Sequence, residues 1–324
     1  MAYLANLTNP VHPAFSKEKF PKYVEYDEVL LQPARLASLL IQTPQDVHYF
    51  LAIIHDADHP SEFENTLGDK SRRTYHELKQ ILELRPSDFT RVERELEQVA
   101  ETLLWDFQNL NINDYAETRL KLSVDASDPN SLSARSIVVI NQDFYVAIAQ
   151  ATKSVKLLRL QFLLGVTMAH ELSHATWYAL TTMVSTDCEP VFGPSGSGEA
   201  GDELEARLFG FRAAEEDKLS GKIKWFKLVT FQDGQNQGAE RPVGRVHIDF
   251  IQRLFADWFW QHYFSTKHAW TIIPSLAWSP EMSVPSSISA LIHSTTTFTP
   301  PGPIAEVKEI FKKRKRSDDD DEDK

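Results

Sequence analysis

Two histidines four residues apart, with a glutamate directly after the first, occur in the stretch "TMAHELSHATWYAL" at residues 167 to 180. Residues four apart on an α-helix project from the same face, so the imidazoles of His170 and His174 can bind one zinc ion. Glu171, one position further around, would point at a water on the open coordination position of that metal. Zinc lowers the pKa of such a water to about 7, and a carboxylate can accept its proton as the water attacks a carbonyl. The spacing predicts a hydrolytic zinc centre, against the alternative of two core histidines paired within the fold.

A third ligand is available on the next expected helix. Glu199 follows His174 after 24 intervening residues that include a loop rich in glycine and proline. Glu203 lies about 40° around a helix from Glu199, whereas Glu205 lies about 240° away. Glu199 and Glu203 can therefore face the zinc together, without Glu205 on that face. Glu199 is available as the third ligand, and Glu203 could then accept a hydrogen bond from the outer N–H of a ligating histidine. The residue types leave Glu203 and Glu205 as alternative third ligands.

The motif needs a helix and neighbouring strands to position it. A long helix is expected from about Ser154 to Met183, where the chain lacks proline and is rich in Leu, Met, Ala and Phe. A small sheet should precede it, because "ETRLKLSV" alternates apolar with polar residues and Ile137 to Ile140 form an apolar run. After the motif, "EAGDELEARLFGFRAAEEDKL" has helical composition and "KIKWFKLVTF" is typical of a strand.

Two further amphipathic helices are expected on either side of this core. The first is "SDFTRVERELEQVAETLLWDF", with Ser87 as its N-cap. Its buried stripe would comprise Phe89, Val92, Leu96, Val99, Leu103 and Phe107. The second is "HIDFIQRLFADWFWQHYF", whose buried face would hold Ile248, Ile251, Phe255 and Trp258.

The sequence predicts an α+β protein in three regions. Residues 1–115 form a mainly helical N-terminal region, and residues 116–278 form the metal-binding core. Residues 279–324 are rich in Pro, Ser and Thr and end in blocks of like charge, so this tail should be disordered.

Charge and cysteine content limit the partners. The formal net charge is −12, and from Lys312 onward six basic residues cancel six acidic ones, so the remainder carries the whole −12. A body this acidic repels phosphate backbones, which makes nucleic acid an unfavourable partner. No opening signal segment and no membrane-length apolar run is present, and the single cysteine, Cys188, suits a reducing intracellular compartment. The cluster "KKRKR" predicts a nuclear import receptor as a partner, with a solvated end as the alternative, so cytoplasmic and nuclear locations are both expected.

At these residues the chain resembles the zincin metallopeptidases, and most closely the glutamate-ligand branch, the gluzincins, typified by thermolysin and a group of zinc aminopeptidases. That branch pairs HExxH with a glutamate on a following helix and an acid four residues later, as "HELSH" and "EAGDE" do here. The resemblance implies zinc ligands His170, His174 and Glu199, general base Glu171 and outer acid Glu203. It also implies a zincin-like core that cleaves peptide or protein substrates, aligned along an edge strand at Ile137 to Ile140.

Two other interpretations remain open. The motif helix is similar to that of SprT-like nuclear proteases, which take a third histidine soon afterwards, whereas the next one here is His247. A non-catalytic interaction protein with a zincin-like fold, with or without a structural metal, is the alternative from another class. Oxyanion stabilisation in an enzyme would need a further donor. The available types are Tyr178, His247, His262 and Tyr263.

Overall fold

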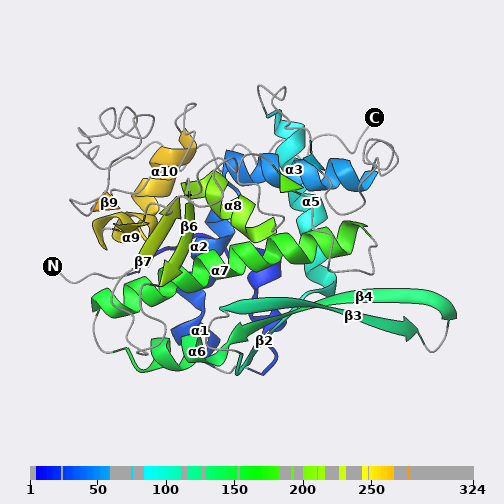
Figure 1. Ribbon diagram of the computed structural model, residues 1–324, viewed down its shortest axis with the longest axis horizontal. Coiled ribbons are helices and arrows are strands. Elements are labelled where there is room, and N and C mark those ends of the chain that lie inside the picture. Colours follow the sequence, from blue (N-terminus) through cyan, green and yellow to red (C-terminus); the bar gives the residue numbers. More distant parts are fainter. Residues whose placement is uncertain are drawn as a thin grey trace, which may run out of the picture. The chain divides into compact units, whose positions relative to one another are not determined.

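The computed structural model is a mixed helix and strand structure in which helices predominate (Figure 1). It describes residues 5–22, 25–58, 74–75, 84–110, 115–125, 128–151, 154–181, 191–192, 200–209, 211–215, 226–230, 243–246, 248–265 and 276–277. Contacts divide the chain into Met1–Ser279 and Pro280–Lys324. All described residues belong to the first unit. The expected disorder and import signal of the tail lie outside them and stay predictions.

The bounds of the elements are as follows. The helices are η1 (Pro13–Phe15), η2 (Lys17–Lys19), α1 (Tyr26–Val29), α2 (Leu31–Leu40), α3 (Pro44–Asp58), α5 (Pro86–Thr102), α6 (Gln142–Ala149), α7 (Ser154–Thr181), α8 (Ala200–Phe209), α9 (Ile248–Leu254) and α10 (Asp257–Ser265). The strands are β1 (Thr74–Tyr75), β2 (Leu104–Gln108), β3 (Ala116–Asp125), β4 (Asp128–Asn141), β5 (Val191–Phe192), β6 (Phe211–Glu215), β7 (Phe226–Thr230), β8 (Val243–Val246) and β9 (Leu276–Ala277). Within the described ranges, no helix combines the length and apolar character needed to cross a membrane.

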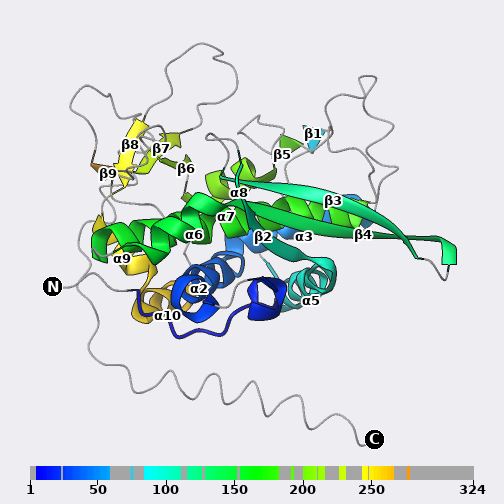
Figure 2. The ribbon, with the colours of Figure 1, turned by 90° about the horizontal axis from the view of Figure 1, so that it is seen from below.

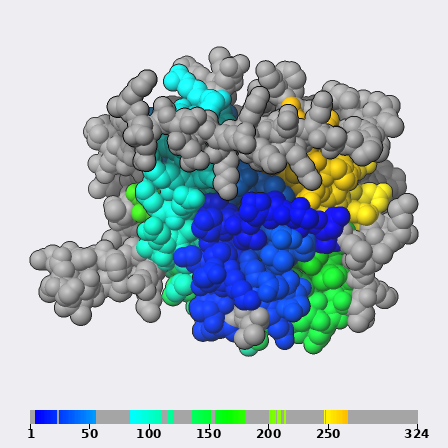
Figure 3. Space-filling model, turned by 180° about the vertical axis from the view of Figure 1, so that it is seen from behind, coloured from blue at the N-terminus to red at the C-terminus, as the bar shows by residue number. Residues whose placement is uncertain are grey.

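The long helix α7 runs through the middle of the first unit, and its bounds confirm the helix expected around the motif (Figure 1). Leu164 and Met168, one turn apart, are fully buried. Helix α2 approaches so closely that a Cβ atom on Gly165 would lie 3.0 Å from Cδ2 of Leu36. Helices α2, α3 and α5 all pack on α7, so both sides of the boundary expected near residue 115 belong to one unit. Figure 3 shows the opposite side, where the blue N-terminal residues lie beside the cyan ones of α5.

A three-stranded sheet packs against α7, in the order β2-β4-β3. Strand β4 pairs in parallel with β2 and antiparallel with β3, where Thr118 lies opposite Val138. The expectation that Ile137 to Ile140 form an edge strand is therefore wrong, because β4 is central. Val138, Val139 and Ile140 are all buried, and a continuous apolar run is typical of a strand covered on both faces. Strand β3 is the edge strand beside α7 (Figure 2).

Helix α5 ends earlier than expected. It stops at Thr102, and Phe107 belongs to β2. Leu103 is already extended, and the β-favouring residues Trp105 and Phe107 follow it, so pairing with β4 overrides the helical spacing.

The start of α5 also differs from the expectation. The N-cap is Arg85, and its backbone N–H donates to Oδ2 of Asp88 at 2.8 Å, so Ser87 lies inside the first turn. Phe89 is partly exposed, at 36%, whereas the later stripe residues Val92 and Leu96 are buried. The buried stripe therefore begins one turn later than predicted.

The region after the motif contains more strand than its composition predicted. Helix α8 ends at Phe209, and the following residues form β6 in an antiparallel sheet of order β6-β7-β8-β9; β1 and β5 form a separate parallel pair. The strand expected in "KIKWFKLVTF" is present as β7. The expected aromatic helix is divided into α9 and α10, and at the junction the Phe255 carbonyl accepts a hydrogen bond from the Asn6 N–H at 3.2 Å. Trp258 is consequently 43% exposed, not buried with Phe255 as predicted.

Candidate metal and catalytic centre

The motif helix holds its two histidines close together on one face. The ring centroids of His170 and His174 lie 5.2 Å apart, and the ring planes are inclined by 51°. Two imidazoles bound through Nε2 to one tetrahedral zinc, at about 2.1 Å each, have centroids about 5 Å apart. The spacing of the rings therefore fits a shared zinc ion. Both side chains are partly exposed.

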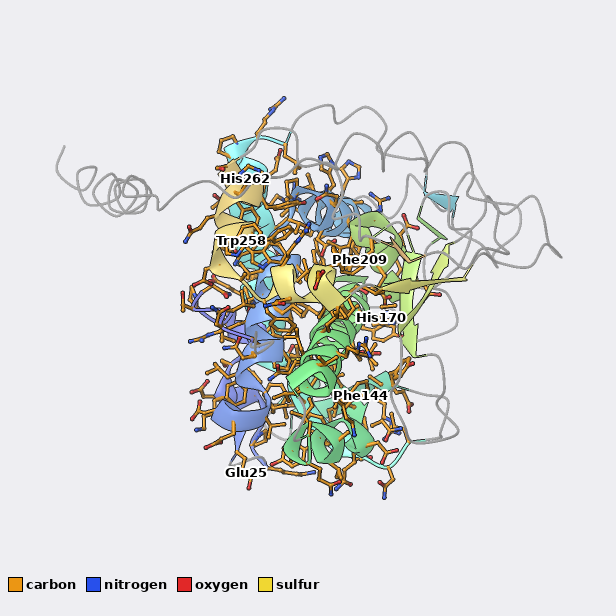
Figure 4. All side chains as sticks on the ribbon, turned by 90° about the vertical axis from the view of Figure 1, so that its left-hand side faces the viewer. Glu25, Phe144, His170, Phe209, Trp258 and His262 are labelled. Atoms are coloured by element: carbon orange, nitrogen blue, oxygen red, sulfur yellow. The ribbon has the colours of Figure 1, made fainter. Side chains whose placement is uncertain are left out.

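A buried carboxylate fixes the orientation of His170. Nδ1 of His170 lies 2.7 Å from Oε1 of Glu205, which is only 4% exposed. The other oxygen, Oε2, accepts a hydrogen bond from the backbone N–H of Ala213 on β6 at 2.5 Å. If the carboxylate of Glu205 is the acceptor, Nδ1 of His170 carries the proton, and a neutral imidazole in this tautomer has its lone pair on Nε2. That is the tautomer a metal ligand needs. Figure 4 shows His170 on the side of α7 that faces β6.

A glycine lets α8 approach the same ring. A Cβ atom on Gly201 would lie 2.2 Å from Cδ2 of His170 and 2.3 Å from its Nε2. No side chain fits in that space, so the imidazole occupies the position where α8 has no Cβ. Sequence reasoning missed Gly201, although a glycine inside a helical stretch is itself a signal of close approach.

On α8 the acid in contact with His170 is Glu205, whereas the sequence led us to expect Glu203. Glu203 is buried, and its Oε1 accepts a hydrogen bond from Nε of Arg207 at 2.8 Å. Glu205 and Gly201 share the face that meets His170, so the expectation that Glu205 points away from the motif is wrong. The helical period correctly put Glu203 and Glu205 on different sides of α8. It does not determine which of those sides packs on α7, because that depends on tertiary contacts.

The opposite side of α8 packs on α3. The Tyr49 hydroxyl donates to the Ala200 carbonyl at 2.8 Å, and the Arg207 guanidinium lies 5.8 Å from the centre of the Tyr49 ring. Asp46 lies on the same helix α3 and is fully buried, which raises the pKa of its carboxyl well above the usual range, although Arg207 acts in the opposite direction. Helix α3 thus fixes α8 from the side opposite His170.

Glu171 is anchored from the sheet. Its side chain is 5% exposed, and its Oε2 accepts a hydrogen bond from the Thr118 hydroxyl on β3 at 2.6 Å. No other described residue donates to the side chain, so Oε1 receives no hydrogen bond from that part of the chain. Sequence reasoning missed Thr118. The signal was available, because Thr118 is two residues before Leu120 and lies on the apolar side of the predicted alternation.

The metal and its expected third ligand, Glu199, stay predictions. Glu199 lies outside the described residues, which resume at Ala200. Among the side chains that the structure does describe, no group of three or more His, Cys, Asp or Glu lies together as a metal-binding cluster. The described part of the site is therefore the histidine pair and the groups that hold it.

The three candidate oxyanion donors that the structure describes lie in different places. Tyr178 is buried, and its ring stacks on His174 with centroids 6.5 Å apart, so it belongs to the motif face. The Tyr263 hydroxyl donates to Oε1 of Gln45 at 2.7 Å, and burial raises its pKa. His262 lies on α10, away from His170 (Figure 4), and His247 lies outside the described residues. Of the three described donors, the structure brings Tyr178 to the motif.

The arrangement gives each motif residue a defined setting. His170 is held by α8 and β6, and Glu171 is held by β3. The ring of Tyr178 lies beside His174, one turn further along α7. Such an arrangement can hold a metal ion beside a carboxylate that accepts protons. Comparison of the chain with protein-family models, with curated proteins and with solved structures found no match.

Proposed function

We propose that this protein is a zinc-dependent metallopeptidase with a zincin-like core made of α7, α8 and the sheet β2-β4-β3. The observation that carries the proposal is the contact between His170 and Glu205, which orients Nε2 of His170 for a metal. A histidine that serves only to fill the core would be buried and would not need a buried carboxylate at Nδ1. His170 has such a carboxylate, and its ring is partly exposed. The 5.2 Å spacing to the ring of His174 supports the same conclusion.

Each residue has a distinct role in this proposal. His170 and His174 hold the zinc, with Glu199 as the third ligand. When bound, zinc lowers the pKa of a coordinated water to about 7 and polarises the scissile carbonyl. Glu171 accepts the proton of the attacking water and passes it to the leaving amine. Thr118 supports Glu171, and Glu205 supports His170 in the role that the resemblance gave to Glu203.

The substrate is a peptide or an unfolded protein segment. Strand β3 is the edge strand beside α7, and the N–H and C=O groups along an unpaired edge can align an extended chain. Thr118 places this edge next to Glu171. The proposal thus moves the substrate-aligning strand from β4 to β3.

Metal analysis of the purified wild type, followed by incubation with a mixed peptide library, tests the function. We expect about one zinc per chain and cleavage of peptides that stops when a chelator removes the metal and resumes when zinc is restored. Absence of bound zinc would refute the proposal. Zinc without cleavage would indicate the non-catalytic interaction protein.

A matched pair on α8 tests the assignment of the outer carboxylate. Glu205→Ala should weaken zinc binding about 10- to 100-fold, because His170 loses the group that fixes its tautomer and ring angle. Glu203→Ala should keep the zinc affinity, although it should lower Tm by leaving Arg207 without its buried partner. Zinc titration of both variants gives the comparison. The reverse result would restore Glu203 as the outer acid and contradict the role of Glu205.

A further inference from the structure

Strand β3 contributes a side chain to the catalytic machinery, which is a different role from aligning a substrate by its backbone. The Thr118 hydroxyl lies 2.6 Å from Oε2 of Glu171 and also 3.3 Å from the Glu171 carbonyl. A hydroxyl has one proton, and the shorter contact shows that it is directed mainly at the carboxylate. The bond joins residues 53 apart in the chain, so it depends on tertiary packing.

This hydrogen bond limits the positions that the carboxylate can take. Glutamate has three rotatable side-chain bonds, so a carboxylate without a partner would sample several rotamers. It would then be placed correctly for proton transfer only part of the time. Here one oxygen is fixed by β3, and Oε1 receives no hydrogen bond from the described residues. Thr118 thus holds Oε2, and the proposed function assigns the proton-accepting role to the other oxygen, Oε1.

We propose that Thr118 is a positioning residue for the general base, and that it couples the edge strand β3 to the reacting centre. This inference rests on the proposed function. The hydrogen bond places the base beside the edge at which an extended peptide would pair with β3. The residue acts through Glu171 and does not touch the metal.

Variants at position 118 test the role. Thr118→Val keeps the shape of the side chain and removes the hydroxyl, so we expect kcat on the best library peptide to fall about 10- to 100-fold. KM and zinc content should stay unchanged, and Thr118→Ser should restore most of kcat. Thr102→Val is the matched control, since the Thr102 hydroxyl bonds the Val99 carbonyl on α5, away from the motif. An unchanged kcat in Thr118→Val, or equal losses in the Val and Ser variants, would overturn the inference.

A second measurement does not depend on activity. Thr118→Val should lower Tm by leaving the buried Glu171 carboxylate without its partner, whereas the same change in a Glu171→Leu background should have little effect. Equal shifts of Tm in the two backgrounds would show that Thr118 does not act through Glu171. If the wild type binds no zinc and cleaves nothing, the proposed function fails. The coupling between Thr118 and Glu171 is still decided by this double-mutant cycle.

Discussion

Glu171→Gln should remove most of the peptide hydrolysis and leave the zinc in place. Glutamine has nearly the same shape, and its carbonyl oxygen can still accept the hydrogen bond from Thr118. It cannot accept a proton from the attacking water, so the loss in kcat/KM should be about 100- to 10,000-fold, the range typical of a general base. Steady-state kinetics and metal analysis of the same preparation measure both effects.

Glu117→Gln is the control for this variant. Glu117 is on the same strand as Thr118, but its carboxylate faces solvent and pairs with Arg119 at 2.9 Å. The activity of Glu117→Gln should equal that of the wild type. Loss of zinc from Glu171→Gln would mean that Glu171 is a ligand, and full activity would mean that another group is the base.

The sequence was sufficient to predict the parts of the site that depend on local spacing. An interval of four residues in a proline-free apolar stretch fixes both a helix and a shared face, so α7 and the pairing of His170 with His174 follow directly. The edge-strand error could also have been avoided. The continuous run Ile137 to Ile140 indicates burial on both faces, whereas the alternation in "ETRLKLSV" indicates a strand with one exposed face.

The contacts between elements could not be predicted in this way. The helical phase correctly separated Glu203 from Glu205, but it cannot tell which side of α8 meets α7. That choice depends on the Tyr49 bond to α8 and on the space above Gly201, which join residues far apart in the chain. Likewise, the spacing of apolar residues in "TLLWDF" fits a helix, and only the pairing with β4 shows that Leu104 to Phe107 form a strand.

The groups that hold the motif come from two different sheets. Strand β3 reaches Glu171 through Thr118, and β6 reaches His170 through the Ala213 N–H and Glu205. Two neighbouring residues of one helix are thus held from different elements. A change in the packing of either sheet should therefore displace one of these two residues more than the other. A change in the helix propensity of α7 would affect both residues together.

Gly201→Ala should empty the metal site. The new methyl group would lie 2.2 Å from the His170 ring, so the imidazole must rotate away or α8 must retreat from α7. Either movement breaks the contact of His170 with Glu205 and also displaces His170, which is one of the proposed zinc ligands. Zinc affinity should therefore fall by more than the roughly 100-fold upper range for losing an outer partner. Zinc titration and thermal melting of the variant measure the effect.

Gly165→Ala is the matched control on the neighbouring helix. Its methyl group would lie 3.0 Å from Leu36 and 3.1 Å from the Pro33 carbonyl, a tight contact that has no part in the site. We expect a change in Tm and an unchanged zinc affinity. The double variant Gly201→Ala with His170→Ala should recover the Tm lost in Gly201→Ala, because the alanine at position 170 vacates the space, and it should still bind no zinc. If Gly201→Ala binds zinc as tightly as the wild type, the imidazole is not held against α8, and the orientation of His170 by Glu205 cannot be the basis of metal binding.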